Sequence, residues 1–179
     1  MTTDSIVSFY SGGRDDHNRT LEAILAWPDD RLEGVHDYIQ WVFPTDVPSG
    51  VNPVAPLVTQ QTAEAFASSA ELRDRLRHAL DRMLSFYGLK RSSTANGDVV
   101  IAIDVSRFAE RGPNWLRPGN HNHLRLTRIL QCLWILGLRA EAQALQRCLL
   151  IDVYEGPGRS RIARDTWAFW KNALGSSAI

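Results

Sequence analysis

The sequence has no stretch approaching the roughly 20 apolar residues that a membrane-spanning helix needs. Residues 1–8 also lack the basic start and apolar run of a secretory signal. Only two cysteines occur, Cys132 and Cys148, and neither lies in a metal-binding or redox spacing. We therefore expect a cytoplasmic protein without a transmembrane segment, in which both cysteines are reduced and serve as small core residues.

The sequence also lacks an excess of charge of either sign. Its 20 basic and 20 acidic residues cancel, so no long-range field attracts nucleic acid or an anionic membrane surface. The arginines of residues 73–82 alternate with acidic residues, a pattern typical of a solvated helix face. We predict no nucleic-acid partner.

Motifs for catalysis, cofactors and metals are missing as well. Neither a dinucleotide-binding GxGxxG nor a phosphate-binding GxxxxGK motif occurs, and residues 11–13 lack the strand-to-helix turn of a hydrolase nucleophile. His121 and His123 would point about 200° apart on a helix, which makes them a weak pair of metal ligands. We assign no catalytic residue, no metal and no cofactor.

What the sequence does contain is enough apolar material for one core. Its 179 residues, 44% of them hydrophobic, are typical of a single soluble domain. Apolar residues recur at helical spacing almost throughout, so we predict an all-α fold: a single compact domain of about seven helices with long irregular connections. The expected helices cover residues 29–42, 59–67, 69–87, 105–111, 120–136, 139–154 and 161–174. Residues 99–103 are predicted to form one short extended segment, too isolated to build a sheet.

Four segments together resemble a known family. The central one, HDYIQWVFP at residues 36–44, combines three aromatic residues with three side chains able to hydrogen-bond. The others are FYSGGRD at 9–15, MLSFYG at 83–88 and NHNHLRLTRIL at 120–130. In this order they resemble the opioid growth factor receptor conserved region, a domain found at the N-terminus of the animal receptor and as short bacterial proteins. The chain looks most like the short bacterial members.

The resemblance implies a binding role, because the animal members are described as receptors for an opioid peptide, Met-enkephalin, that act at the nuclear envelope and in the nucleus. It brings no catalytic residues. The conserved domain would cover residues 1–155, with 156–179 as a C-terminal helical appendage packed on the same domain. The motif positions that we hypothesise to contact a ligand are Arg14, Asp15, His36, Tyr38, Gln40, Trp41, Asn122, Arg125 and Arg128.

The last motif raises a question of charge. Asn122, Arg125 and Arg128 recur every three residues, so they share one face of a helix. They lie in its first half, near the positive end of the helix dipole, where cations lose stability. One interpretation is an internal partner, Asp15 or Asp37, in a hydrogen-bonded network that fixes how three segments dock.

The other interpretation is an external partner, a peptide or a small anionic ligand such as a phosphate or a peptide carboxylate. The same polar groups would then line a pocket with Tyr38 and Trp41 as its aromatic walls. On this basis we predict a non-enzymatic binding protein.

Two alternatives belong to other functional classes. An enzyme could use His36 together with a carboxylate such as Asp15. A purely structural role would follow if Trp167, Phe169 and Trp170 formed an exposed apolar patch that makes a homodimer.

Overall fold

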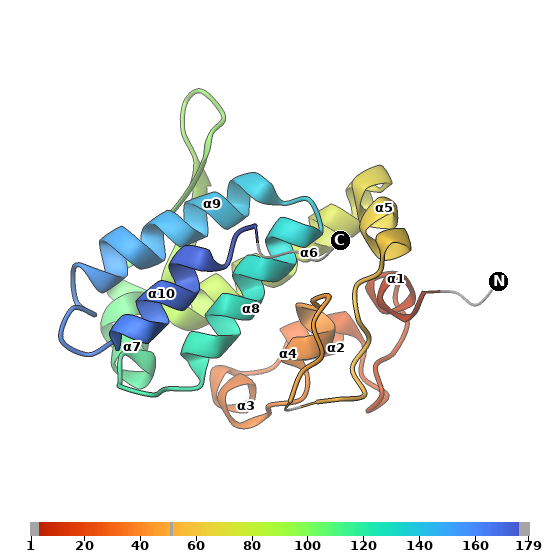
Figure 1. The fold of residues 1–179 in the computed structure, drawn as a ribbon, viewed down its shortest axis with the longest axis horizontal. Helices are drawn as coiled ribbons and strands as arrows, with labels where there is room; N and C mark the ends of the chain where they lie inside the picture. The colour runs from red at the N-terminus through yellow and green to blue at the C-terminus, as the bar shows by residue number, and fades with distance from the viewer. Residues whose placement is uncertain (1–3, 51, 176–179) are drawn as a thin grey trace.

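The structure is a computed structural model that describes residues 4–50 and 52–175. Figure 1 shows helices α1 to α4 on one side of α8, and α9 and α10 on the other. The helices are α1 (Ser5–Tyr10), α2 (Leu21–Leu25), α3 (Asp29–Gly34), α4 (Ile39–Val42), α5 (Gln60–Ser68), α6 (Ala70–Tyr87), α7 (Val105–Trp115), α8 (Asn122–Ile135), α9 (Arg139–Arg147) and α10 (Arg164–Asn172). A π-helical segment, Cys148–Tyr154, follows α9 directly, and the strands are β1 (Leu89–Ser93) and β2 (Val99–Ile103).

Helix α6 confirms the predicted helix at 69–87. Its start is capped by Ser69, whose side chain accepts the backbone N–H of Leu72. Its apolar face lies in the core, and Gly88 ends it in the left-handed conformation with φ at 78°. A Cβ atom at Gly88 would lie only 2.5 Å from the Cα of Phe108, so glycine is required both for the backbone angle and for the close approach of α7.

The all-α prediction was wrong, because residues 99–103 do build a sheet. Strand β1 pairs with β2 in antiparallel register, with Leu89 opposite Ile103. The turn between them closes through a hydrogen bond from Thr94 N to Asp98 O and a positive φ at Gly97. Ile101 is buried while the rest of β2 is half-buried, and the hairpin projects from the helical body (Figure 1). The fold is therefore mostly helical with a two-stranded sheet.

The described residues also hold ten α-helices rather than about seven. The single helix predicted at 29–42 is two short ones, α3 and α4, separated by residues 35–38. The break falls at Val35, whose ψ of 132° is extended rather than helical. Because α3 stops there, its last carbonyl groups need hydrogen-bond donors from elsewhere in the chain.

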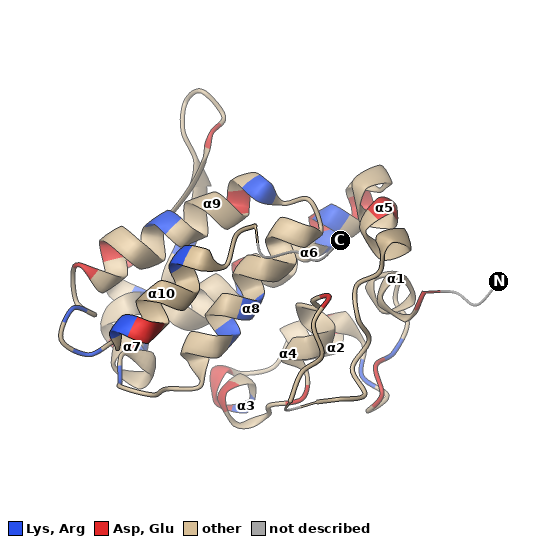
Figure 2. Cartoon of the chain, in the orientation of Figure 1, with Lys and Arg blue, Asp and Glu red and all other residues tan. Residues whose placement is uncertain are grey.

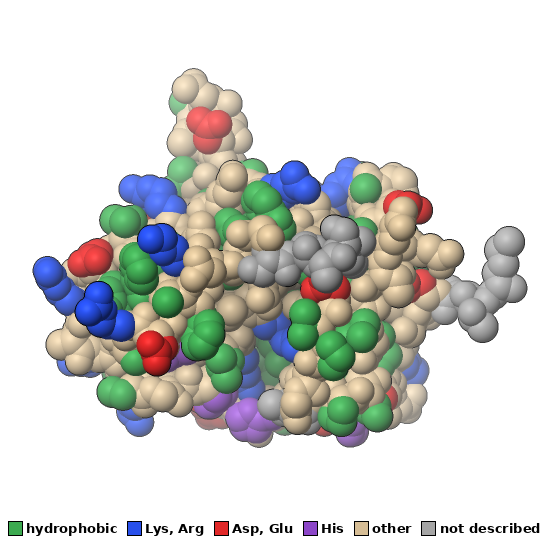
Figure 3. All heavy atoms as spheres, viewed as in Figure 1, with side chains coloured by type: hydrophobic (Ala, Val, Ile, Leu, Met, Phe, Trp, Pro, Cys, Tyr) green, Lys and Arg blue, Asp and Glu red, His purple; other side chains and the backbone are tan. Residues whose placement is uncertain are grey.

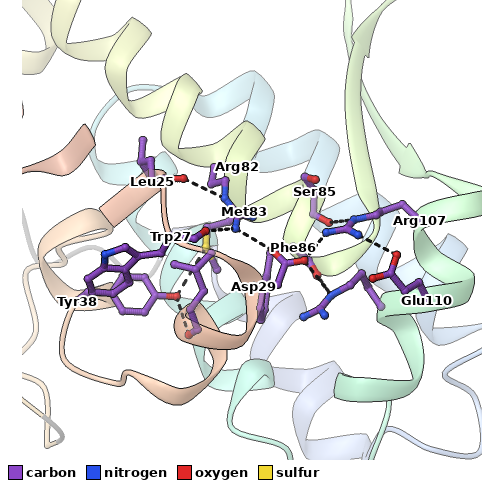
Figure 4. Close-up of polar contacts among 12 residues, drawn as sticks. Leu25, Trp27, Asp29, Tyr38, Arg82, Met83, Ser85, Phe86, Arg107 and Glu110 are labelled. Atoms are coloured by element: carbon purple, nitrogen blue, oxygen red, sulfur yellow. Dashed lines mark hydrogen bonds and ion pairs between the residues drawn. The ribbon is translucent and has the colours of Figure 1, made fainter. Parts of the chain in front are cut away.

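One half-buried carboxylate joins this N-terminal part to α6 and α7. Asp29, at the start of α3, accepts Arg82 Nη2 at 2.8 Å and also pairs with Arg107 (Figure 4). Arg111 Nε lies 3.5 Å from the same carboxylate. Arg82 donates further to the carbonyl of Trp27 at 2.7 Å. Asp29 thus balances three arginines from two helices, in addition to favouring the N-terminus of its own helix.

Helix α10 packs on α8 through a tryptophan. Trp170 is fully buried, and its Nε1 donates to the carbonyl of His123 at 3.2 Å. Phe169 beside it remains 55% exposed. Trp170 therefore belongs to the core rather than to a surface patch, while the division at residue 155 and the homodimer stay predictions.

Two predictions from the composition concern the cysteines and the membrane. Cys132 and Cys148 are both free and buried, and burial raises the pKa of each thiol. Within residues 4–50 and 52–175, none of the helices has the length and apolar character to cross a membrane.

Candidate functional site

A cavity of about 340 Å³ lies between α8, the segment that leads into α4, and the loop after α4. Its lining residues are His36, Ile39, Gln40, Pro48, Ser49, Gly50, His121, Leu124, Arg125, Thr127, Arg128 and Gln131. Figure 3 shows basic side chains in a hollow of the surface, with histidine side chains near its rim. The central motif and the last motif, 85 residues apart at His36 and His121, therefore meet at one site.

Arg125 holds the two sides of this cavity together. It is 5% exposed, and its guanidinium donates to the carbonyls of Leu32 at 2.9 Å and Val35 at 2.8 Å. A further bond reaches Asn122 Oδ1 at 3.3 Å, and the ring centroid of Tyr38 lies 5.5 Å from Arg125 Cζ. Arg125 thus caps the C-terminal end of α3, where free carbonyls and the helix dipole favour a cation.

Arg128 is partly buried and has few partners. Its Nη1 donates to Thr45 Oγ1 at 3.1 Å and weakly to the carbonyl of Phe43 at 3.4 Å. Burial lowers the pKa of its guanidinium, and no described carboxylate lies within ion-pair distance to oppose that effect. Arg128 is therefore a desolvated cation at the wall of a cavity, without a counter-ion among residues 4–50 and 52–175.

Two histidines form the rim. The rings of His36 and His121 make an edge-to-face contact with centroids 4.9 Å apart. His36 Nδ1 lies 3.3 Å from Arg125 Nη2, and His121 Nε2 lies 3.4 Å from a carboxylate oxygen of Glu33. Burial, Arg125 and His36 lower the pKa of His121, whereas Glu33 opposes them.

Buried amides fix the polar groups around the cavity. Asn122 is fully buried, donates to both carboxylate oxygens of Glu33 at 3.0 and 3.3 Å, and accepts the hydroxyl of Tyr87 at 3.3 Å. The side-chain nitrogen of Gln40 donates to the carbonyls of His36 and Asp37, both at 3.2 Å. These bonds orient the groups that hold Arg125 and His36 in place.

Two other predicted residues lie behind the cavity rather than in its wall. Tyr38 is fully buried, with its hydroxyl donating to the carbonyl of Leu32 at 3.2 Å, and burial raises its pKa to about 12. Trp41 is 7% exposed and its ring centroid lies 5.5 Å from that of Phe9. Both belong to the core, and the aromatic walls expected from the sequence are absent from the described lining.

The opening motif forms a separate cluster. Asp15 pairs with Arg19, whose Nε lies 2.6 Å from its carboxylate, and Arg19 Nη1 reaches Asp37 at 2.8 Å. Asp15 also accepts the backbone N–H of Arg19 at 2.8 Å, and Arg14 donates to the carbonyl of Asn18 at 2.8 Å on the exposed side. Neither acid pairs with Arg125, so the internal partner expected there is provided by the carbonyls at the end of α3 instead.

Arg19 is the residue that sequence reasoning missed. Its signal was its spacing of four residues from Asp15, just after the opening motif. Outside a helix, residues four apart form an ion pair only when a turn brings them together. Here the carboxylate of Asp15 makes that turn by accepting the backbone N–H groups of His17 and Arg19.

The arrangement of charges indicates what the cavity can bind. Figure 2 shows basic positions along α8 near the segment of α3 and α4. The described lining contains two arginines and two histidines, and it contains no aspartate or glutamate. Within the described part of the chain, no group of three or more His, Cys, Asp or Glu side chains could hold a metal ion. Such a cavity favours an anion, with hydrogen bonds from guanidinium and amide donors.

Sequence comparison now identifies the domain. The model of the opioid growth factor receptor conserved region matches residues 9–177. The chain belongs to this family. The opioid growth factor receptor of Mus musculus is 44% identical over 133 residues, which cover 73% of this chain and 20% of that protein.

Other relatives support the same family assignment. The human receptor is 39% identical over 155 residues, which cover 83% of this chain and 22% of that protein. The opioid growth factor receptor-like protein 1 of Mus musculus is 33% identical over 137 residues, covering 72% and 27% respectively. The chain thus spans about a fifth to a quarter of the length of the curated relatives that it matches. No solved structure gives a significant match.

Proposed function

We propose that this opioid growth factor receptor-like domain is a non-enzymatic binding protein whose cavity beside α8 takes the carboxylate of a peptide. The observation that carries the proposal is Arg128, a partly buried cation that lines the cavity and has no described acidic partner. A buried charge is costly unless it is paired, so an anionic group in the cavity would offset a cost already present in the free protein.

The neighbouring surface favours a ligand with an apolar body. A second cavity, of about 220 Å³, shares His121, Leu124 and Thr127 with the first and is also lined by Phe169. Leu124 is 65% exposed and Phe169 is 55% exposed. A chain whose carboxylate contacts Arg128 therefore has an apolar surface beside it for its last side chains. The relatives are named receptors, which agrees with a binding role.

The enzyme alternative has less support. It rested on His36 acting with Asp15, but the carboxylate of Asp15 is paired with Arg19. The contacts of His36 are to Arg125 and His121, both of which oppose a second positive charge. A general base would need a proton acceptor directed at a substrate, and here Nδ1 already accepts from a guanidinium.

Replacing Arg128 by leucine is expected to weaken binding of a peptide carboxylate by about 10-fold to 100-fold, since a charge-assisted hydrogen bond is lost. The free energy of unfolding should stay unchanged or rise, because the leucine keeps the apolar volume and removes a desolvated charge. The probe is an N-acetylated tripeptide that ends in leucine with a free carboxylate, titrated by calorimetry or nuclear magnetic resonance.

Two controls define this experiment. The same peptide as its C-terminal amide should bind much more weakly than the acid, and Arg159→Leu, at an exposed arginine, should leave affinity for the acid unchanged. Equal binding of acid and amide by the wild-type domain would contradict an anion site. So would an Arg128→Leu variant that binds the acid as tightly as wild type.

A further inference from the structure

We propose that anion binding in this cavity is coupled to proton uptake by the His36 and His121 pair, so that the domain holds its ligand more tightly as the pH falls. This proposal rests on the proposed function and adds that pH regulates the binding of the anion. The two rings come from separate elements, the α3–α4 connection and the start of α8, and both line the cavity. A charge bound inside the cavity would therefore lie close to both imidazole rings.

The contact with Arg125 identifies which ring nitrogen of His36 is the acceptor. Arginine nitrogens only donate, so a contact of 3.3 Å between Arg125 Nη2 and His36 Nδ1 requires that Nδ1 carry no proton. A proton on Nδ1 would place two donors against each other and break this contact. The exposed ring of His36 would then turn its N–H toward any negative group in the cavity.

The protonation of His121 depends on charged groups of both signs. The charged groups around the pair are Arg125 and Arg128 from α8 and Glu33 from α3. Glu33 is shared with the buried amide of Asn122, and it is the only described carboxylate within ion-pair distance of either ring. Burial and the neighbouring positive charges lower the pKa of His121 in this state.

Asp37 follows His36 directly in the chain, yet its charge is already engaged. Its carboxylate pairs with Arg19 at 2.8 Å and lies 3.3 Å from His17 Nε2. It therefore does not supply the missing negative charge to the cavity. A bound anion would supply that charge, and it would raise the pKa of His121.

The sign of the linkage follows. If the bound form has the higher histidine pKa, binding takes up protons, and affinity rises as the pH falls through the pKa of the bound form. Affinity levels off below the pKa of the free form, where both forms are protonated. Because the pKa of free His121 is lowered from 6.5, the rise is expected between about pH 7.5 and 5.

Sulfate is the probe for this test, since it keeps its double charge across that pH range and leaves the protein as the only titrating partner. Titrations at constant ionic strength should give about tenfold tighter binding at pH 5 than at pH 7.5, the change produced by raising one histidine pKa by one unit. Calorimetry at pH 6 in two buffers of different ionisation enthalpy should show uptake of up to about 0.5 proton, the largest value that a rise of one unit in one pKa allows.

The variants separate this proposal from the proposed function. The double variant His36→Gln/His121→Gln, or His36→Gln alone if the double variant does not fold, should reduce the pH dependence, whereas His78→Gln on the exposed side of α6 should retain it. Saturable sulfate binding with equal affinity at both pH values and no proton uptake would overturn the coupling alone. Absence of saturable sulfate binding at either pH would overturn the anion site and the coupling with it.

Discussion

Replacing Arg125 by leucine is expected to lower the free energy of unfolding by about 3 kcal/mol, because the carbonyl of Val35 loses the guanidinium as a donor and the buried carbonyl of Leu32 keeps only the hydroxyl of Tyr38. Leu32 and Val35 would be left at the end of α3 without a cation to cap the helix. For a chain of this length the loss corresponds to a fall in melting temperature of about 10 °C. Thermal and denaturant unfolding of the two proteins side by side measures it.

Arg159→Leu is the matched control, since it deletes the same charge at an exposed position and should change stability by less than about 0.5 kcal/mol. A melting temperature for Arg125→Leu equal to that of wild type would contradict the capping role. It would also mean that Arg125 is free to serve a ligand, as Arg128 is proposed to be.

The second large effect is expected at Asp29. Asp29→Asn keeps the size of the side chain but leaves Arg82, Arg107 and Arg111 without their shared carboxylate (Figure 4). Removing the shared partner of this partly buried ionic cluster leaves charges uncompensated, so stability should fall by about 3 kcal/mol. Chemical denaturation with urea, which adds no ions, is the suitable measurement.

Asp30→Asn provides the control in the same helical turn. Asp30 is exposed and also favours the N-terminus of α3, so its loss should cost only about 0.3–1 kcal/mol. If Asp29→Asn and Asp30→Asn were equally stable, the arginine cluster would contribute little and the helix dipole would explain both. A difference of at least about 2 kcal/mol separates the two explanations.

The parts of the fold that the sequence predicted are those decided by local signals. Helix α6 has a serine cap, an uninterrupted apolar face and a terminal glycine, and its predicted bounds at 69–87 agree with Ala70–Tyr87. The hairpin was missed because the exposed strand β1 contains mostly polar residues and depends on β2 for its pairing. The break between α3 and α4 was missed because a distant residue, Arg125, supplies the donors that let α3 end.

The candidate site could be predicted only in part for the same reason. The spacing in the last motif predicted the cationic face of α8. The structure places Arg125 and Arg128 in one cavity with His36 and Gln40. Local spacing could not show that Asp15 forms an ion pair with Arg19, because that pair depends on a loop that is fixed by hydrogen bonds to backbone N–H groups. It also could not distinguish the aromatic residues of the core from those of a wall, since both require the same large side chains.

The central claim is that an anion binds beside Arg128. Nuclear magnetic resonance of the side-chain Nε–H groups of arginine during a titration with the N-acetylated tripeptide acid tests it most directly. The account predicts a saturable shift for Arg128, with nearby shifts for the backbone amides of α8, and none for exposed Arg159. Shifts confined to exposed arginines, or shifts of equal size with the peptide amide, would contradict it.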